Sequence, residues 1–320
     1  MERTKSTAII ILNYNNYNDT INCIESVKKF NTAPVKYIIV DNGSSKINCI
    51  NKIDNYLKNT FHDNYKCVCE GDKTDTLKYV TFLISKTNDG YAEGNNKGLR
   101  LAYNDPEIEN ILILNNDILF VEDIIPQLIN SLYTLNNAAI VSPILYKKDF
   151  NGIDYTCARK ELTLKQRFLI YALLFKDVFG IISRINNSNN LLYNKKLSQI
   201  SNPIEIELPS GSCMLFNKFF FKSIDSFDPH TFLYCEEDIL YAKIKKLGKK
   251  NYLNTNLKCI HLGASTTSSQ VTSKFTLKCS LESNHYFLIY YSNANKLYLI
   301  CMKFFYKMMY LKFYIKSLLK

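Results

Sequence analysis

The chain has 320 residues, which is enough for two domains of ordinary size or for one large α/β unit with an appendage. Hydrophobic residues make up 47% and charged residues 22%, a globular composition that excludes wholesale disorder, a collagen-like fibre and a coiled coil. Forty Lys and Arg against 29 Asp and Glu give a net charge of +11, which indicates an anionic partner such as a nucleic acid, a nucleotide or a lipid headgroup.

The cysteines and the start of the chain predict a cytoplasmic protein. Ten cysteines are scattered along a chain too long to need disulfide staples, which predicts buried, reduced thiols. No cleavable signal pattern precedes the first apolar run, and no stretch reaches the roughly 18 uninterrupted apolar residues of a membrane span. Cys67 and Cys69 stand close together, but a C-x-C pair without a second Cys or His pair is a weak indication of zinc.

The first half of the chain alternates short apolar runs with helical patterns. Strands are predicted at residues 8–12, 35–40, 79–84 and 111–114, and helices after the candidate cap Asp19 and over residues 47–58 and 93–103. This alternation predicts an α/β fold with a doubly wound, mostly parallel, Rossmann-like sheet, in which ligands bind beyond the carboxyl ends of the strands. Polar residues cluster at those ends, namely at Asn13 to Asn15, Asp41 with Asn42, Asn88 to Gly90 and Asn115 to Asp117.

The second half of the chain is less regular. Residues 161–184 predict an apolar helix, and residues 186–203, which are rich in Asn and Ser, predict a loop or a linker. Further polar segments follow at 208–212 and 234–238 and at His261.

Two polar segments of the first half are candidates for binding a nucleotide. Asp41 begins a sharp turn where its carboxylate can accept hydrogen bonds from a base or a ribose, although a plain β-turn explains the same residues. Gly90, Gly94 and Gly98 are spaced by four at a helix start, which fits neither the dinucleotide-binding fingerprint nor a P-loop. Dehydrogenase and NTPase functions are therefore disfavoured. The small residues allow either close approach of a ligand or tight packing of the helix on the sheet.

Acidic residues and one histidine supply the candidate catalytic and metal-binding groups. Asp117 follows an apolar strand, so its carboxylate can hold a hard cation against a diphosphate, although a strand-end turn or a helix cap also explains it. Glu236, Glu237 and Asp238 stand side by side before an amphipathic helix, whose start favours negative charge. Their mutual repulsion is expected to raise the pKa of at least one of them, which suits a general base. His261 can bind a metal or a phosphate, or serve a structural role.

In their order and spacing these segments resemble the family 2 glycosyltransferases of the GT-A fold, most closely the rhamnosyltransferase-like branch. The matching segments are Asn13 to Asn15, Val40 to Ser44, Asn88 to Gly98, Leu114 to Asp117, Gly211 to Met214, Phe227-Asp228, Phe232 to Tyr234, Glu236-Glu237, Gly248 and His261 to Ser265. The resemblance implies a nucleotide-sugar-binding half at 1–117, and an acceptor-binding half at 118–268 with a variable insertion near 150–205. Residues 269–320 then form a basic, aromatic, helical C-terminal extension.

The resemblance also implies roles for particular residues. Contacts to the nucleotide fall to Asn13, Asn15, Asp41, Asn88, Gly90, Asn95 and Asn115, and the acceptor side comprises Gly211, Ser212 and Glu236. Asp117, together with His261, would hold a divalent cation, Mn²⁺ or Mg²⁺, against the leaving diphosphate. Glu237 would be the catalytic base of an inverting transfer, with Asp238 as an alternative because many relatives carry Glu-Asp-x-Asp-Leu at this point. Lys97 and Arg100 are candidates for phosphate contacts or for a solvated surface.

The C-terminal segment concentrates the positive charge. From Ser283 to Lys320 there is no acidic residue, and from Tyr286 onward aromatic residues are dense and the only charges are lysines. This mixture predicts peripheral contact with an anionic membrane, on the inner face of the cell membrane, or else a helix packed on the catalytic domain. No nucleic-acid motif accompanies the charge, so nucleic acid is not an expected partner.

The function expected from the resemblance is transfer of a sugar to a hydroxyl of a glycan or a lipid-linked glycan, in surface polysaccharide synthesis. Nucleoside-diphosphate sugars such as dTDP-rhamnose or a UDP-hexose are the expected donors. Two alternatives stay open. A sugar nucleotidyltransferase would need a Gly-rich loop with Arg and Lys near the N-terminus, where this chain has Asn13-Tyr-Asn-Asn-Tyr-Asn18. A binding protein with a GT-A fold and no turnover is the other.

Overall fold

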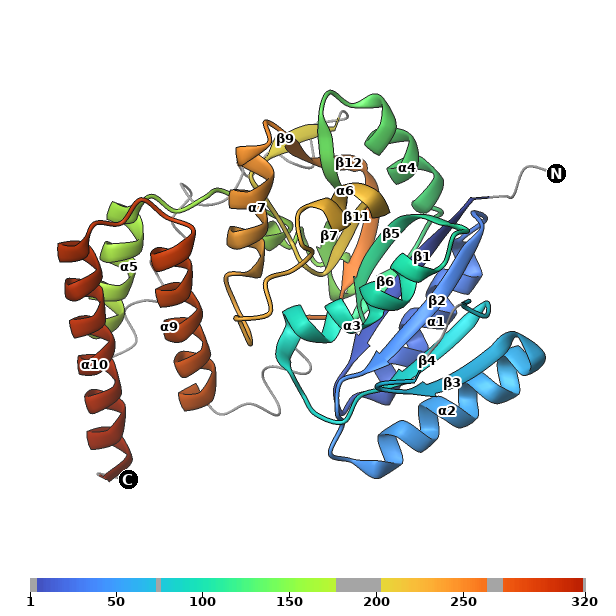
Figure 1. Ribbon diagram of the computed structural model, residues 1–320, viewed down its shortest axis with the longest axis horizontal. Coiled ribbons are helices and arrows are strands. Elements are labelled where there is room, and N and C mark those ends of the chain that lie inside the picture. The colour runs from blue at the N-terminus through green and yellow to red at the C-terminus, as the bar shows by residue number, and fades with distance from the viewer. Residues whose placement is uncertain (1–4, 73–75, 177–202, 264–272, 319–320) are drawn as a thin grey trace.

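The computed structural model describes residues 5–72, 76–176, 203–263 and 273–318 (Figure 1). Its first half contains β1 (Ser6–Asn13), α1 (Tyr17–Phe30), β2 (Val35–Asp41), α2 (Ile47–Phe61), β3 (Tyr65–Cys69), β4 (Val80–Ile84), α3 (Gly90–Asn104), β5 (Ile108–Asn115), β6 (Ile118–Phe120) and α4 (Ile125–Thr134). Its second half contains β7 (Ala138–Lys147), β8 (Ala158–Arg159), α5 (Leu164–Lys176), β9 (Ile204–Ile206), β10 (Leu208–Pro209), β11 (Cys213–Asn217), α6 (Lys218–Ser223), α7 (Glu236–Lys246), β12 (Lys250–His261), α9 (Ser273–Tyr290) and α10 (Lys296–Leu318). Short 3₁₀ turns lie at His62–Asn64, Lys148–Phe150 and Tyr155–Cys157.

The predicted strands and helices of the first half are confirmed, with their ends shifted by a few residues. The helix predicted from residue 161 begins at Leu164 and is described as far as Lys176. The rest of that helix and nearly all of the loop predicted at 186–203 lie outside the described residues.

One large sheet organises the molecule. Its strands run in the order β3-β4-β2-β1-β5-β11-β7-β12-β6, with β9 paired to β12. The strands from β3 to β5 are parallel, β11 is antiparallel to both of its neighbours, and β12 is parallel to β7. This arrangement confirms the predicted α/β fold with a mostly parallel sheet.

Helices cover both faces of this sheet. Alternate residues of β1 face opposite sides, so Ile9 and Ile11 pack with α1, α2 and α4, whereas Ala8 and Ile10 pack with α3, α6 and α7. All four side chains are fully buried. A parallel strand covered on both faces must be apolar at successive positions, which is why the apolar run at 8–12 predicted a buried strand.

Helix ends follow local side-chain chemistry. Asn16, rather than the predicted Asp19, caps α1, because its side chain accepts a hydrogen bond from the backbone N–H of Asp19. Helix α7 begins with the three adjacent acids and ends with Lys243, Lys245 and Lys246, an order that complements the helix dipole at both ends.

The C-terminal helices form a separate layer. Helices α5, α9 and α10 pack on one another and on α7, around Leu281, Leu288 and Met302. Figure 1 shows this layer at the opposite end of the molecule from β3 and α2. Within the described ranges, no helix is both long and apolar enough to cross a bilayer.

Strand β3 was not predicted. It lies at the edge of the sheet, and only Val68 of its five residues is buried, so its sequence lacks the apolar run of the inner strands. Cys67 and Cys69 are exposed on this strand. All ten cysteines are free thiols. Six of them are buried as predicted, whereas Cys67 and Cys69 are exposed and Cys235 and Cys301 are partly exposed.

Candidate active site

Two of the residues predicted to contact a nucleotide, Asn13 and Asp41, lie at the carboxyl ends of β1 and β2, where the two strands are paired in register. The Asn13 amide donates to Asp41 Oδ2 over 2.7 Å, and Asp41 Oδ1 accepts from the Ser44 N–H over 2.8 Å. Asn13 and Asp41 are both fully buried. The next predicted residue, Asn15, is partly exposed and bonds the same turn through the Ser44 hydroxyl. This network fixes the turn that follows β2.

Asn88 and Gly90 are held by a neighbouring strand end. The Asn42 amide donates to Asn88 Oδ1 and to the carbonyl of Gly90, each over 2.9 Å. Gly90 has a φ of +79°, and a Cβ there would lie 2.1 Å from the carbonyl oxygen of Phe232. That carbonyl accepts from the Tyr91 N–H over 2.9 Å, so only glycine lets the start of α3 approach Phe232 this closely.

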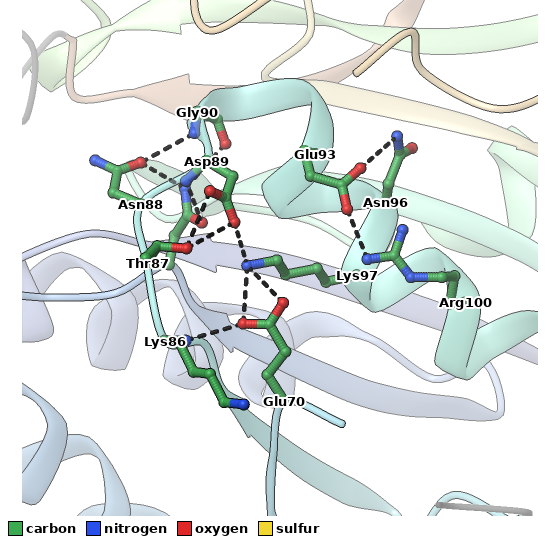
Figure 2. Close-up of polar contacts among 11 residues, drawn as sticks. Glu70, Lys86, Thr87, Asn88, Asp89, Gly90, Glu93, Asn96, Lys97 and Arg100 are labelled. Carbon is green, nitrogen blue, oxygen red and sulfur yellow. Dashed lines mark hydrogen bonds and ion pairs between the residues drawn. The ribbon is translucent and has the colours of Figure 1, made fainter. Parts of the chain in front are cut away.

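The loop that precedes α3 is also tied down by charges, as Figure 2 shows. The Lys97 ammonium lies 2.6 Å from Asp89 and 3.2 Å from Glu70, and its side chain is 2% exposed. Glu70 also accepts from the backbone N–H of Lys86. Lys97 is therefore neither a solvated residue nor one directed at a phosphate, since its charge is used inside this cluster.

Two other predicted residues, Arg100 and Asn95, also lie on α3. Arg100 pairs with Glu93 over 2.7 Å at the surface, as Figure 2 shows. Asn95 is buried and donates to the carbonyl of Tyr91, while its Oδ1 has no hydrogen-bond partner within the described part of the chain.

Asp117, His261 and Asp154 form a hydrogen-bonded chain. Asp117 follows β5, His261 ends β12, and Asp154 lies in the connection after β7. Asp117 Oδ2 lies 3.3 Å from His261 Nε2, and Asp154 Oδ2 lies 2.7 Å from His261 Nδ1. Burial lowers the pKa of His261, but its hydrogen bonds to the two carboxylates outweigh burial and raise the pKa to about 9. The pKa of Asp154 is about 2, because hydrogen bonds from His261 and Thr156 outweigh the opposite effect of its burial.

This pair of Asp117 and His261 fits a divalent cation. Asp117 Oδ1 is buried and has no hydrogen-bond partner among the described residues, so it is an unused oxygen ligand beside an imidazole nitrogen. The described ranges contain no ready-made cluster of three or more His, Cys, Asp or Glu side chains around a cation. Diphosphate oxygens and water would therefore have to complete the coordination shell.

A pocket of about 470 Å³ is lined by residues of β8, α5, β10 and the start of α7. Six of the predicted residues line it, namely Asn115, Gly211, Ser212, Glu236, Glu237 and Asp238. The Asn115 N–H donates to the carbonyl of Ser212 over 2.8 Å, so this pocket adjoins the strand end that carries Asp117.

Glu237 is held by two donors at the wall of this pocket. Its Oε1 accepts from the Gly211 N–H over 3.0 Å, and its Oε2 lies 3.2 Å from the Arg159 guanidinium. The Tyr91 hydroxyl donates to the Gly211 carbonyl over 2.6 Å, and a Cβ at position 211 would lie 2.8 Å from that hydroxyl oxygen and 3.1 Å from Glu237 Oε1. The carboxylate is oriented, and its side chain keeps 18% exposure toward the pocket.

The three adjacent acids have different surroundings. Burial, with the nearby charge of Glu237, raises the pKa of Glu236 to about 8, so the raised pKa expected in this cluster falls on Glu236. Asp238 also lines the pocket, but it pairs with the buried Arg167, which donates to Asn284 over 2.7 Å. Of the two candidate bases, Glu237 is the more exposed, with 18% of its side chain exposed against 10% for Asp238.

The entry into α7 is strained. Tyr234 and Cys235 have φ values of +74° and +66°, in the left-handed region that non-glycine residues rarely adopt. Strain of this kind is found at functional sites, where the surrounding structure maintains it. Here it precedes the two glutamates of the pocket directly.

The sequence did not predict a role at the site for Tyr91, Arg159 or Asp154. Tyr91 lies in the matching segment Asn88 to Gly98, to which no role for Tyr91 was attached, and Arg159 and Asp154 lie in the variable insertion expected near 150–205. Arg159 reaches Glu237 because β8 pairs with β10, with Arg159 opposite Leu208, shortly before Gly211. No local sequence pattern predicts the pairing of β8 with β10.

Comparisons with known proteins agree with this geometry. A sequence profile described as "Glycosyl transferase family 2" matches residues 8–224. A curated relative, the low-salt glycan biosynthesis hexosyltransferase Agl10 of Haloferax volcanii, is 23% identical over 233 residues, which are 72% of this chain and 58% of the relative. The chain thus spans little more than half the length of this relative.

A solved structure of GalNAc-T7 with UDP, GalNAc and Mn²⁺ has the same type of fold. It superimposes with a TM-score of 0.55 at 12% identity, over 82% of this chain and 44% of that one. The predicted GT-A type of α/β fold is confirmed.

Proposed function

The chain belongs to glycosyl transferase family 2, and on that premise we propose that it transfers a sugar from a nucleoside-diphosphate sugar to a hydroxyl of a glycan or lipid-linked glycan acceptor, with inversion. The observation that carries this proposal is Glu237, oriented by Gly211 and Arg159 at the wall of a pocket that adjoins the Asp117–His261 pair. In this proposal residues 1–117 hold the donor and residues 118–268 hold the acceptor. The relative from Haloferax volcanii, a hexosyltransferase, supports glycan synthesis as the context.

The proposed chemistry needs a base on the face of the sugar opposite the leaving nucleotide. Glu237 would take the proton of the acceptor hydroxyl while that oxygen attacks the anomeric carbon, and the bond to the nucleoside diphosphate breaks. Arg159 orients one oxygen of the carboxylate, and the Gly211 N–H orients the other. Glu236 and Ser212 would line the acceptor side of the same pocket.

The leaving group is the second requirement. A divalent cation, Mn²⁺ or Mg²⁺, would neutralise the charge that develops on the diphosphate, and Asp117 and His261 are the residues that would hold it. Asn15, Asn88, Asn95 and Asn115 would contact the nucleotide, with Asn13, Asp41 and Gly90 shaping the edge that receives it. The solved neighbour that binds UDP and Mn²⁺ supports this assignment by its fold alone.

The proposal is tested by a panel of nucleotide sugars that includes dTDP-rhamnose, UDP-hexoses and UDP-N-acetylhexosamines. Release of the nucleoside diphosphate is followed with and without Mn²⁺ or Mg²⁺. We expect one sugar nucleotide to be hydrolysed slowly in a cation-dependent way, and faster with a hydroxyl acceptor. A protein that binds such a donor without hydrolysing it would instead be a binding protein, and one that joins a sugar phosphate to a nucleoside triphosphate would be a nucleotidyltransferase.

Asp117→Asn should weaken donor binding in the presence of Mn²⁺ by more than about tenfold, because the cation loses the charge of one of its two protein ligands. Calorimetric titration with the donor or with its nucleoside diphosphate measures the effect. The same titration in EDTA is the internal control and should not distinguish the variant from wild type. An unchanged Mn²⁺ dependence in the variant would rule out the ligand role of Asp117.

We also infer that α10 contacts an anionic membrane. Its inner face packs through Met302, Tyr306 and Met309, which are buried in the C-terminal layer. Its outer face exposes a group of apolar side chains, Leu297 at 70%, Ile300 at 65%, Phe304 at 60% and Leu311 at 50%.

These apolar side chains lie beside a row of lysines. At about 100° per residue the four apolar residues share an arc of about 60°, and Lys296, Lys303 and Lys307 occupy the adjoining arc. All three lysines are exposed, and no acidic residue follows Glu282 in the sequence. Apolar side chains flanked by lysines fit the interface of an anionic bilayer, where rings and aliphatic groups enter the headgroup region and lysines meet lipid charges.

The double variant Ile300→Ser/Phe304→Ser should lose at least about tenfold in affinity for vesicles that contain phosphatidylserine, because each such side chain contributes about 1.5–3 kcal/mol when buried. Co-sedimentation measures the affinity. Phe219→Ser, which changes a side chain with 67% exposure on α6, is the matched control and should bind as wild type does. Equal binding of all three proteins, or equal binding to neutral vesicles, would contradict this membrane contact.

A further inference from the structure

One carboxylate of the site has no role in the chemistry described so far. Asp154 lies outside the strands, in the connection that follows β7, next to the bridge between Tyr146 and Ile153. Its Oδ2 lies 2.7 Å from His261 Nδ1. The other nitrogen of that ring, Nε2, faces Asp117 Oδ2 over 3.3 Å. The imidazole is therefore held between two carboxylates, one at each nitrogen.

Asp154 is itself fixed in place. Its Oδ1 accepts from the Thr156 N–H over 3.0 Å and from the Thr156 hydroxyl over 2.7 Å. Its backbone N–H donates to the Leu145 carbonyl over 2.8 Å, which anchors it to β7. The side chain is 17% exposed. Only Oδ2 remains for the histidine, and the four contacts leave that oxygen little freedom to move.

The consequence concerns the tautomer and the orientation of His261. When a carboxylate accepts the Nδ1–H of an imidazole, the proton stays on Nδ1 and the lone pair of Nε2 is available to a cation. The ring plane is set at the same time. In this chain Nε2 faces Asp117 Oδ2, so a cation that replaces the Nε2 proton would also meet Asp117, whose Oδ1 is buried without a partner among the described residues.

We propose that Asp154 is a positioning residue, which holds His261 through Nδ1 so that Nε2 and Asp117 together present a preformed pair of ligands to a divalent cation. The proposal rests on the cation of the proposed function. It goes beyond that function because it assigns part of the cation affinity to a residue that touches neither the cation nor the substrates. Outer partners of this kind change metal affinity by about 10- to 100-fold when they are lost.

The test is a Mn²⁺ titration of the full chain followed by the electron paramagnetic resonance of free Mn²⁺, with no sugar nucleotide present. Asp154→Asn should weaken Mn²⁺ binding by about 10- to 100-fold. Asp149→Asn is the matched control, because Asp149 is exposed five residues earlier and has a φ of +57°, which asparagine tolerates well. The control should bind Mn²⁺ as wild type does.

The outcomes are distinguishable. If wild type and Asp154→Asn bind Mn²⁺ equally, the positioning role is overturned while the proposed function stands. If wild type binds no Mn²⁺ even when UDP is added, both the positioning role and the cation of the proposed function are overturned. If it binds Mn²⁺ only with UDP, wild type and the two variants are compared with UDP present. A purely structural role for Asp154 would lower the melting temperature without changing the Mn²⁺ affinity of the folded fraction, and this result also overturns the proposal.

A second measurement covers the case in which Asp154→Asn does not fold. In wild type loaded with Zn²⁺, a diamagnetic substitute, the ¹⁵N shifts of His261 should show a proton on Nδ1 and none on Nε2. A proton on Nε2 would overturn the proposal without any variant.

Discussion

Glu237→Gln should lower the rate of sugar transfer by roughly 10²- to 10⁴-fold, the contribution that a positioned general base makes. Glutamine has nearly the same shape and can still accept from the Gly211 N–H, but it cannot take a proton. Donor binding should therefore be preserved. Product formation at saturating donor measures the first effect, and calorimetric titration with the donor measures the second.

Two variants make this result specific. Glu205→Gln removes an exposed carboxylate that pairs with Lys250, away from the pocket, and should leave the rate unchanged. Asp238→Asn tests the alternative base, which the structure pairs with Arg167. Near-normal turnover in Glu237→Gln together with a large loss in Asp238→Asn would move the catalytic role to Asp238.

Arg167→Met should lower the free energy of unfolding by about 3–5 kcal/mol, the cost of leaving a buried charge without its partner. Arg167 is 3% exposed, pairs with Asp238 and donates to Asn284, and its guanidinium lies 4.2 Å from the centre of the Phe287 ring. These contacts join α5, α7 and α9 in one buried cluster. Urea unfolding followed by circular dichroism measures the change.

Arg100→Met is the matched control for this prediction. Arg100 makes the same type of ion pair with Glu93, but its side chain is 55% exposed, and exposed pairs contribute about 0–1 kcal/mol. Adding Asp238→Asn to Arg167→Met should recover part of the loss, because the unpaired charge is then removed. Similar losses in the two single variants would show that the buried pair does not stabilise the C-terminal layer.

Sequence patterns predicted the fold best where burial on two faces imposes a continuous apolar run. The strands at 8–12, 35–40 and 111–114 are of this kind, and each appears as an inner strand of the sheet. Strand β3 was not predicted because only one of its five residues is buried, so its sequence has no continuous apolar run. The cap of α1 was misplaced by three residues because Asn16 and Asp19 are both good capping residues, and only the backbone geometry decides between them.

The site was predictable to the extent that it follows from strand ends. Asp41 is the last residue of β2, and Asp117 follows the end of β5 by two residues. The carboxyl ends of these parallel strands share one edge of the sheet. Contacts between distant segments were not predictable. Lys97 looked like a surface residue or a phosphate ligand, and only the fold shows that it is buried against Asp89 and Glu70.

The most direct test of the proposed mechanism is the anomeric configuration of the released sugar. Donor hydrolysis, with water in place of the acceptor, can be followed by proton NMR before the free sugar mutarotates. A single displacement assisted by Glu237 predicts that the first sugar to appear has the configuration opposite to that of the donor. A product that retains the donor configuration would contradict this mechanism.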